Sequence, residues 1–550
     1  MKKNLTVWNL FSVVILAAFA LFIMYPIFLI LYKSVIHGDT GALTLQNFAH
    51  FFAKKFYWGT MVNSLKVTVI STILSAALGL LLAYLMRSVK IKGSSFLNIL
   101  IVISYLSPPF IGAYAWIQML GRQGVITQFL NDTFGLHYGG VYGFAGIVLV
   151  FTLQSFPLVY IYVSGALKNL DNSLNEAAES LGCSRMGRIW KIIVPLVMPT
   201  LLASSMLVFM RVFADFGTPM LIGEGYKTLP VLIYNQFMGE VSGDDGFAAA
   251  ICCIVIGLTI VMFFIQRFLA GRNTYAMTAL KPMAAESLGG LRNILAHLAV
   301  YMVVGLAILP QFVVVYTSFL ATNGGQVFTG GFALQSYDAT LFAKDNDVIW
   351  HTYFLGLCAI AAVLVLGVLI AYLSVRKRNT LNSILDVITM FPFIIPGSVL
   401  GIAFVFAFNK SPIILTGTAL IMIISFAVRR MPYTVRSSTA ILGNISPSIE
   451  EAAISLGASD MTTFRKITVP MMMPGVLSGA IMSWVTIISE LSSSIILYAN
   501  STQTLTVSIY TEVIRGNYGN ASAYVTILTV TSILSLLLFY KVTGRRDVSV

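Results

Sequence analysis

One segment of 24 residues occurs twice in this chain. Residues 176–199 read EAAESLGCSRMGRIWKIIVPLVMP, and residues 451–474 read EAAISLGASDMTTFRKITVPMMMP. The copies align without a gap at an offset of 275 residues (451 − 176), which is half of the 550-residue chain. A repeat of this kind predicts a duplicated architecture. Because several shared residues are polar or charged, core packing does not account for them, and we expect them to carry function.

Each copy predicts a short amphipathic helix, a turn and a return to apolar sequence. Glu176 precedes Ala177 and Ala178, and its carboxylate suits the positive end of a helix dipole. Gly182 is typical of the position just past a helix end, and Pro195 of the first turn of the next helix. The second copy repeats the pattern with Glu451, Ala452, Ala453, Gly457 and Pro470.

The composition indicates an all-α, polytopic membrane protein. Hydrophobic residues make up 57% of the chain and charged residues 10%, whereas soluble domains carry about a quarter charged residues. Apolar runs recur that are long enough to cross a hydrocarbon core of about 30 Å as helices. The first run continues through Ile30, which is too long for a cleaved signal peptide, so it is predicted to be a membrane helix.

We expect about twelve membrane helices, six in each half. Roughly, the spans are 8–32, 61–86, 97–120, 141–167, 196–222 and 247–270, then 294–320, 351–375, 383–408, 412–440, 472–498 and 521–541. The halves are residues 1–285 and 286–550, joined by a polar linker at 271–293. Six spans return the chain to its starting side. The duplicated segments, at about 170–195 and 445–470, therefore face one compartment, and the repeat is parallel.

The positive charge of the chain predicts its orientation. The net charge is +13, and most Lys and Arg residues fall in one alternating set of loops and in both termini. This set includes Arg429 and Arg430, which we place just before the second duplicated segment. Basic loops face the cytoplasm, so both termini and both duplicated segments are expected there. This distribution favours a lipid bilayer over nucleic acid as the partner of the positive charge.

The opposite face carries the longest hydrophilic segments. These are residues 33–60, 223–246, 321–350 and 499–520. A soluble partner could dock on them, although they could equally be solvated loops without a partner.

Two carboxylates within predicted membrane helices are candidates for the translocation path. Asp215 and Glu490 are separated by the same offset of 275 residues (490 − 215), so they occupy equivalent depths. Ionisable residues inside a membrane are costly and usually functional. The alternative is structural, because Arg211 lies one helical turn before Asp215 and could neutralise it. No such partner is local for Glu490.

The chain carries none of the short catalytic motifs considered. It has no GxxxxGK[ST] phosphate loop, no HExxH and no paired CxxC. The sequence therefore predicts a protein that is not itself an enzyme, with no catalytic residues and no bound cofactor, and it leaves metal ligands unknown.

The duplicated pattern EAA-x3-G-x9-I-x-V-P resembles the cytoplasmic signature of permease subunits of binding-protein-dependent ABC importers. Both copies match it in full, from Glu176 to Pro195 and from Glu451 to Pro470. The resemblance implies the type I ABC importer permease fold in the bacterial inner membrane. It also implies that each segment forms a coupling helix seated on a separate ATPase, with Gly182 and Gly457 permitting the turn.

The resemblance further implies partners and a substrate class. One chain with two coupling helices would bind two ATPase copies, which hold ATP and Mg, and a solute-binding protein on the outer side. The segments ADFGTP, ELSSS and TQTLTVSIYTEV are similar to those of fused permeases for ferric iron. An aminophosphonate or another small anion is the alternative substrate, and Arg211 would suit an anion. The alternative from another class is an ATP-independent secondary transporter or channel.

Overall fold

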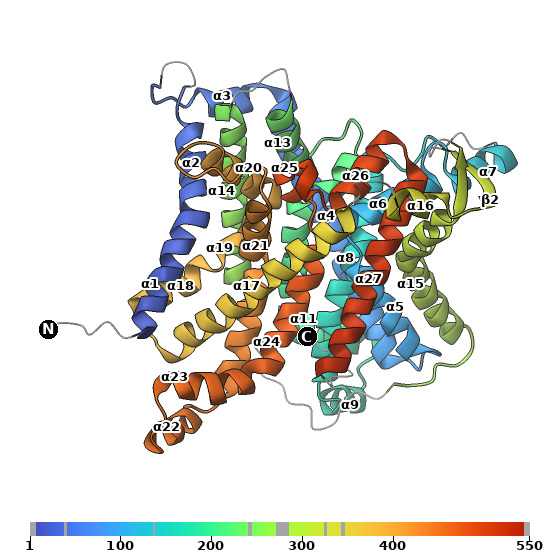
Figure 1. Ribbon diagram of the computed structural model, residues 1–550. Coiled ribbons are helices and arrows are strands. Elements are labelled where there is room, and N and C mark those ends of the chain that lie inside the picture. Colours follow the sequence, from blue (N-terminus) through green and yellow to red (C-terminus); the bar gives the residue numbers. More distant parts are fainter. Residues whose placement is uncertain are drawn as a thin grey trace.

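The computed structural model describes residues 7–37, 41–135, 138–239, 245–270, 285–323, 327–342 and 347–543, and helices dominate them (Figure 1). The first half contains α1 (Val7–Phe19), η1 (Ala20–Met24), α2 (Tyr25–Ser34), α3 (Gln46–Ala53), α4 (Lys55–Ser88), α5 (Ser94–Leu106), α6 (Pro109–Leu120), α7 (Val125–Phe134), α8 (Gly143–Lys168), α9 (Ser173–Ser180), α10 (Arg185–Arg188), η2 (Ile189–Ile193), α11 (Val194–Ala214), α12 (Gly217–Ile222), α13 (Leu229–Met238) and α14 (Asp245–Ala270).

The second half repeats much of this order. It contains α15 (Gly290–Ser318), β1 (Leu320–Asn323), β2 (Val327–Phe332), α16 (Gln335–Leu341), α17 (Val348–Arg376), α18 (Thr380–Ile388), α19 (Phe391–Ile394), α20 (Gly397–Phe408), α21 (Ala419–Asn444), α22 (Pro447–Ser455), α23 (Asp460–Thr463), η3 (Phe464–Thr468), α24 (Val469–Ile488), α25 (Ser494–Leu497), η4 (Asn500–Thr502), α26 (Leu505–Arg515) and α27 (Tyr518–Thr543). The strands β1 and β2 pair as an antiparallel hairpin. The predicted all-α class is confirmed, and residues 271–284 of the predicted linker lie outside the described residues.

The described residues include nine helices that are long and apolar enough to cross a membrane. Two further helix pairs pass the same test together but are bent, by 102° between α5 and α6 and by 111° between α18–α19 and α20. The predictions of continuous helices at 97–120 and 383–408 were therefore wrong. Pro108 and Pro396 immediately precede α6 and α20, in an extended conformation that a helix interior does not accept.

The helix predicted at 412–440 begins later than expected, at Ala419. The side chain of Thr418 caps its first turn by accepting a hydrogen bond from the backbone N–H of Ile421. With 26 residues this helix, α21, is long enough to cross a bilayer, but it carries Arg429, Arg430 and Arg436.

The two halves share one tight helix crossing. Gly79 of α4 faces Val159 of α8, and the equivalent Gly367 of α17 faces Thr434 of α21. A Cβ atom added to Gly79 would lie 2.6 Å from the Cβ of Val159, and one added to Gly367 would lie 2.8 Å from the Cγ2 of Thr434. Only glycine permits this approach, and small residues at such crossings are typical of membrane helices.

The first helices of the two halves are partly exchanged. The α1–α2 segment packs against α17, α18 and α20 of the second half and against α14 of its own, while α15 packs against α5 and α6 of the first half and against α27 of its own. Ser12 donates a hydrogen bond to Asn382 at 2.6 Å, and Tyr301 donates one to the backbone carbonyl of Lys92 at 3.0 Å. The opening helix of each half thus bridges the two halves.

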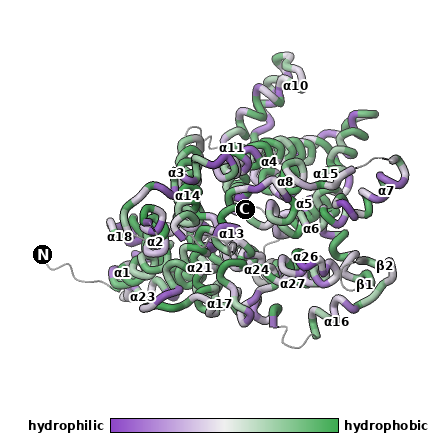
Figure 2. The backbone as a smooth tube through the Cα atoms, turned by 90° about the horizontal axis from the view of Figure 1, so that it is seen from above, coloured by the Kyte–Doolittle hydropathy of each residue, from purple (hydrophilic) through white to green (hydrophobic). Residues whose placement is uncertain are grey.

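Both duplicated segments lie at one end of the molecule. Figure 1 shows α9 and the α22–α23 pair at the lower end, with α3, α7 and the β hairpin at the opposite end. Seen from above, α10 projects away from the helix bundle (Figure 2). The predicted parallel arrangement of the repeat is confirmed.

We predict that Gly79→Ala and Gly367→Ala each destabilise the protein by about 1–3 kcal/mol, because the added methyl group overpacks a helix crossing. Thermal unfolding in detergent would measure the loss. Gly257→Ala in α14 and Gly305→Ala in α15 are matched controls, since nothing lies within 4 Å of a Cβ atom at either position. Equal melting temperatures for all four variants would contradict the importance of the crossing.

Candidate functional site

Each duplicated segment is a short helix that ends at a glycine in the left-handed conformation. The φ angles are +77° at Gly182 and +91° at Gly457, and a Cβ atom at either position would meet nothing within 4 Å. Glycine is needed here for its backbone conformation and not for space. The helices α9 and α22 begin at Ser173 and Pro447, slightly before the Glu-Ala-Ala motif.

The hydrogen bonds at both helix ends form the same Schellman motif. In the first copy, the N–H of Cys183 donates to the carbonyl of Ala178 and that of Gly182 to Glu179, each at 2.9 Å. The second copy repeats these bonds, from Ala458 to Ala453 at 3.1 Å and from Gly457 to Ile454 at 2.9 Å. This pairing satisfies carbonyls at the helix end and fixes the turn.

The turn exposes an apolar tip on each segment. Leu181 is 88% exposed and its equivalent Leu456 is 89% exposed. We define the coupling surface of each half as this leucine with the exposed residues beside it, which are Leu174, Glu176 and Ala177 in the first half and Ile449, Glu451 and Ala452 in the second. Ala178 is half-buried and Ala453 is buried beneath these surfaces. Exposed apolar residues rimmed by polar ones are typical of a protein-binding site.

The second coupling surface is anchored to its membrane helices by two ion pairs, of which the one formed by Arg376 is largely buried. Arg376, at the end of α17, donates hydrogen bonds to Glu450 at 3.0 Å and to the backbone carbonyl of Ile445 at 2.6 Å. Lys377 pairs with Asp460 at 2.8 Å. In the first half, Asn175 stands at the position of Glu450 and Ser88 at that of Arg376, so this ion pair has no counterpart there.

An aromatic cluster reinforces this anchor. Trp8 of α1 lies 4.7 Å from the ring of Tyr372 and 5.2 Å from the ring of Phe464, between ring centroids. Sequence reasoning missed these contacts because they join residues far apart in the chain. The sequence did carry one sign of the anchor: Arg376 and Glu450 have no charged counterparts in the first half, and such a difference between repeats indicates a contact specific to the second half.

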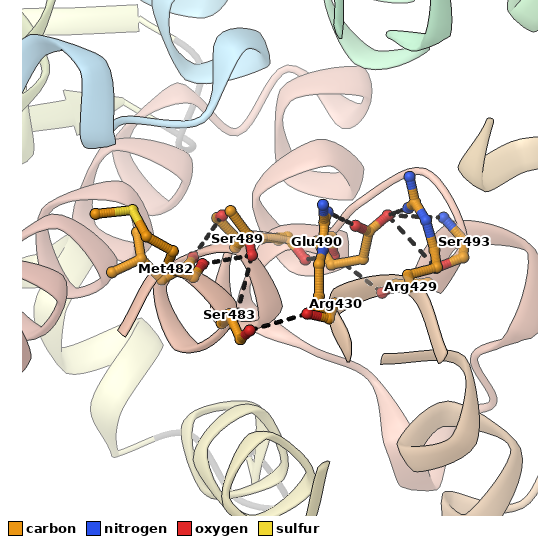
Figure 3. Close-up of polar contacts among 11 residues, drawn as sticks. Arg429, Arg430, Met482, Ser483, Ser489, Glu490 and Ser493 are labelled. Carbon is orange, nitrogen blue, oxygen red and sulfur yellow. Dashed lines mark hydrogen bonds and ion pairs between the residues drawn. The ribbon is translucent and has the colours of Figure 1, made fainter. Parts of the chain in front are cut away.

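The second candidate site is a buried ion-pair cluster around Glu490 (Figure 3). The two carboxylate oxygens of Glu490, whose side chain is 2% exposed, pair with Arg429 and Arg430 of α21. The backbone N–H of Ser493 donates to the same carboxylate at 3.2 Å. Gly397 makes room for this arrangement, because a Cβ atom there would collide with the guanidinium of Arg429.

These contacts correct the placement of the two arginines near the cytoplasmic loop. Arg429 lies ten residues after Ala419 (429 − 419), which is about 15 Å along α21. The arginines are therefore well inside a membrane helix, where Glu490 neutralises part of their charge. The partner of Glu490 is absent from its own helix but present 60 residues earlier in the chain.

Asp215 occupies the equivalent position in the first half with a different environment. The backbone N–H of Thr218 donates to Asp215 at 2.9 Å, as Ser493 does to Glu490. Arg211 lies over the ring of Tyr105, with 4.8 Å between the guanidinium carbon and the ring centroid. Among the described residues Arg211 forms no ion pair with Asp215, which it attracts only at longer range. The structural alternative, in which Arg211 neutralises Asp215 through an ion pair, is thus not what the structure shows, and a backbone hydrogen bond holds the carboxylate instead.

The two carboxylate positions meet where the halves join. Glu490 and Asp215 interact electrostatically across the boundary. A Cβ atom on Gly217 would lie 3.1 Å from Leu491, and the rings of Phe216 and Tyr510 are 6.0 Å apart. In the described part of the chain, no three His, Cys, Asp or Glu side chains gather as a metal site.

Comparisons with known proteins match most of the chain. The family described as "Binding-protein-dependent transport system inner membrane component" matches residues 75–275 and again 363–546. The ferric transport system permease protein FbpB of Actinobacillus pleuropneumoniae is 30% identical, over 97% of this chain and 78% of that relative. The putative ferric transport system permease protein FbpB 1 of Haemophilus influenzae is also 30% identical, over 90% of this chain and 78% of the relative.

A further relative covers about half of the chain. The putative 2-aminoethylphosphonate transport system permease protein PhnU of Salmonella choleraesuis is 26% identical, over 48% of this chain and 92% of the relative.

We predict that Glu490→Gln destabilises the protein by about 3–5 kcal/mol, because it leaves two buried guanidinium groups without their counter-charge. Asp215→Asn should cost far less, since an amide oxygen still accepts the hydrogen bond from Thr218. Thermal unfolding in detergent separates the two outcomes. Combining Glu490→Gln with Arg430→Gln restores the net charge of the cluster and should recover part of the loss; equal losses in the two single variants would refute the role given to the ion pairs.

Proposed function

Because this chain belongs to the family of binding-protein-dependent transport system inner membrane components, we propose that it imports ferric iron. It is the membrane-spanning permease subunit of an ATP-driven importer. The observation that carries the choice of iron is its identity of 30% with ferric permeases along nearly the whole chain. The duplicated coupling surfaces on one face support the mode of energy supply.

In this proposal, each coupling surface docks on one copy of a separate ATPase. Leu181 and Leu456 insert into apolar clefts of the two ATPases, and Glu176 and Glu451 contact their polar rims. ATP and Mg are bound by those partners, and this chain binds no cofactor and catalyses no reaction. The two equivalent surfaces suit two identical ATPase subunits.

A solute-binding protein delivers the substrate to the opposite face. The outer segments that would receive it include α3, the β1–β2 hairpin, α16 and α26. The membrane is the bacterial cytoplasmic membrane, with both termini on the cytoplasmic side. In support, the start of α1 and the end of α27 lie toward the end of the molecule that carries α9 and α22 (Figure 1).

Closure of the ATPases then rocks one half of the permease against the other. Such rigid-body motions are a common way to switch access between the two sides of a membrane. The ion pairs of Arg376 and Lys377 pass movement of the second coupling surface to α17. The translocation path runs between the halves, past Asp215, Glu490 and Arg211.

An aminophosphonate or similar small anion is a second candidate substrate. The relative named for 2-aminoethylphosphonate matches about half of the chain, and the arginines around Glu490 suit an anion. The ferric relatives match both halves, which favours iron.

Reconstitution tests the proposal directly. The chain is placed in liposomes with its ATPase and its solute-binding protein, and ATP hydrolysis is followed while the binding protein is loaded with ferric iron or 2-aminoethylphosphonate. We expect stimulation by the iron-loaded protein. Stimulation only by the phosphonate-loaded protein would show that the substrate is the phosphonate and not iron. Failure of any ATPase to associate would contradict the ATP-driven import mechanism.

We predict that Gly182→Val and Gly457→Val each lower transport at least about tenfold while the protein still inserts. A branched residue in the left-handed conformation costs more than the roughly 1–2 kcal/mol of an ordinary side chain, so the turn reshapes. Transport and ATP hydrolysis are measured together, and hydrolysis should lose its stimulation by loaded binding protein. Gly225→Val on the outer face is the control, because Gly225 is exposed with nothing within 4 Å. Normal transport by both Gly182→Val and Gly457→Val would contradict the role of these turns in coupling.

A further inference from the structure

Polar side chains from both halves gather around Tyr105. The guanidinium carbon of Arg211 lies 4.8 Å from the centroid of its ring. Tyr162 of the first half and Arg430 and Tyr433 of the second lie within electrostatic range of its hydroxyl. Tyr162 also interacts with Tyr433 across the boundary. We name Tyr105, Tyr162, Arg211, Arg430 and Tyr433 the arginine–tyrosine cluster. All five are half-buried, so none of them is fully enclosed by the protein.

Each carboxylate near this cluster already accepts at least one hydrogen bond or ion pair. Both oxygens of Glu490 pair with guanidinium groups, and one also accepts the backbone N–H of Ser493. Asp215 accepts the backbone N–H of Thr218. Ferric iron takes hard oxygen ligands, and oxygens that are held by guanidinium groups are poor ligands for it.

Hydrogen-bond donors, in contrast, are in surplus. Arg211, Arg429 and Arg430 carry three positive charges against the two negative charges of Asp215 and Glu490, which leaves one positive charge in excess. The Nε atoms of Arg429 and Arg430 are buried and have no hydrogen-bond partner within the described residues. Buried donors without acceptors are costly, so this part of the protein lacks acceptors and not donors.

This environment discriminates between forms of the substrate. Coulomb repulsion scales with charge, so a bare trivalent cation is repelled by the surplus charge about three times as strongly as a monovalent one. A ferric ion whose charge is balanced by a bound anion escapes this repulsion, and its anion offers oxygen acceptors to guanidinium and phenol donors.

We propose that iron crosses this permease as a ferric ion still bound to a hard-oxygen anion, and that the arginine–tyrosine cluster contacts that anion. The inference rests on the proposed ferric function and specifies the chemical form of its substrate. Arg211 and Arg430 approach from opposite halves, so they grip the complex while the path between the halves is closed.

A double-label uptake experiment tests the inference. Liposomes containing the full complex receive binding protein loaded with radioactive iron together with radioactive citrate, or in a second arm with radioactive phosphate. We expect at least one of the two anions to enter the lumen with the iron, in a comparable molar amount and only with ATP. Iron that enters while both anions stay outside overturns the inference. Absence of iron uptake with a bound, active ATPase instead overturns the ferric substrate, and this inference with it.

The direction in which iron uptake changes when an arginine is removed provides an independent test. Arg211→Gln should lower iron and anion uptake together by about tenfold, the effect of one lost charge-assisted hydrogen bond. Arg211→Lys should recover part of this loss. Arg122→Gln, at an exposed ion pair with Glu224 on the outer face, is the control for loss of an arginine. A rise in iron uptake in Arg211→Gln would identify a bare cation as the substrate and overturn the proposal, as would unchanged uptake in both Arg211→Gln and Arg430→Gln.

Discussion

The tight crossing of α4 on α8, repeated as α17 on α21, determines where the other functional elements lie. Glycine at positions 79 and 367 brings the two backbones together, and the second helix of each pair leads directly to a coupling segment. The same helix α21 also carries the arginines that reach Glu490. One packing constraint therefore positions both the coupling surfaces and the charged cluster around Glu490.

The repeat made much of this architecture predictable. Apolar run lengths located most membrane helices, and the offset of 275 residues paired Asp215 with Glu490 and Gly182 with Gly457. The length of an apolar run does not predict a helix correctly where the backbone turns within that run. Pro108 and Pro396 each immediately precede a new helix at a bend of more than 100°, which hydrophobicity alone does not reveal.

Contacts that break the repeat were beyond the reach of sequence patterns. Arg429 and Arg430 occupy positions held by Gln154 and Ser155 in the first half, so equivalence between the halves gave no hint of their ion pairs. Arg376 and Glu450 likewise replace Ser88 and Asn175. In both cases the second half has gained charge where the first half is neutral. The two halves have thus kept a common frame and diverged in the polar contacts inside it.

The exchange of the opening helices has a consequence for biogenesis. The α1–α2 segment is synthesised first, yet its contacts with α18 and α20 cannot form until the ribosome has passed Phe408. Until then, the apolar face of α1–α2 that will contact the second half is covered only by lipid or by other helices of the first half. The native membrane arrangement must therefore close late, after most of the chain has been inserted. A truncated first half would keep α14 but lack the helices of the second half against which α1 and α2 also pack.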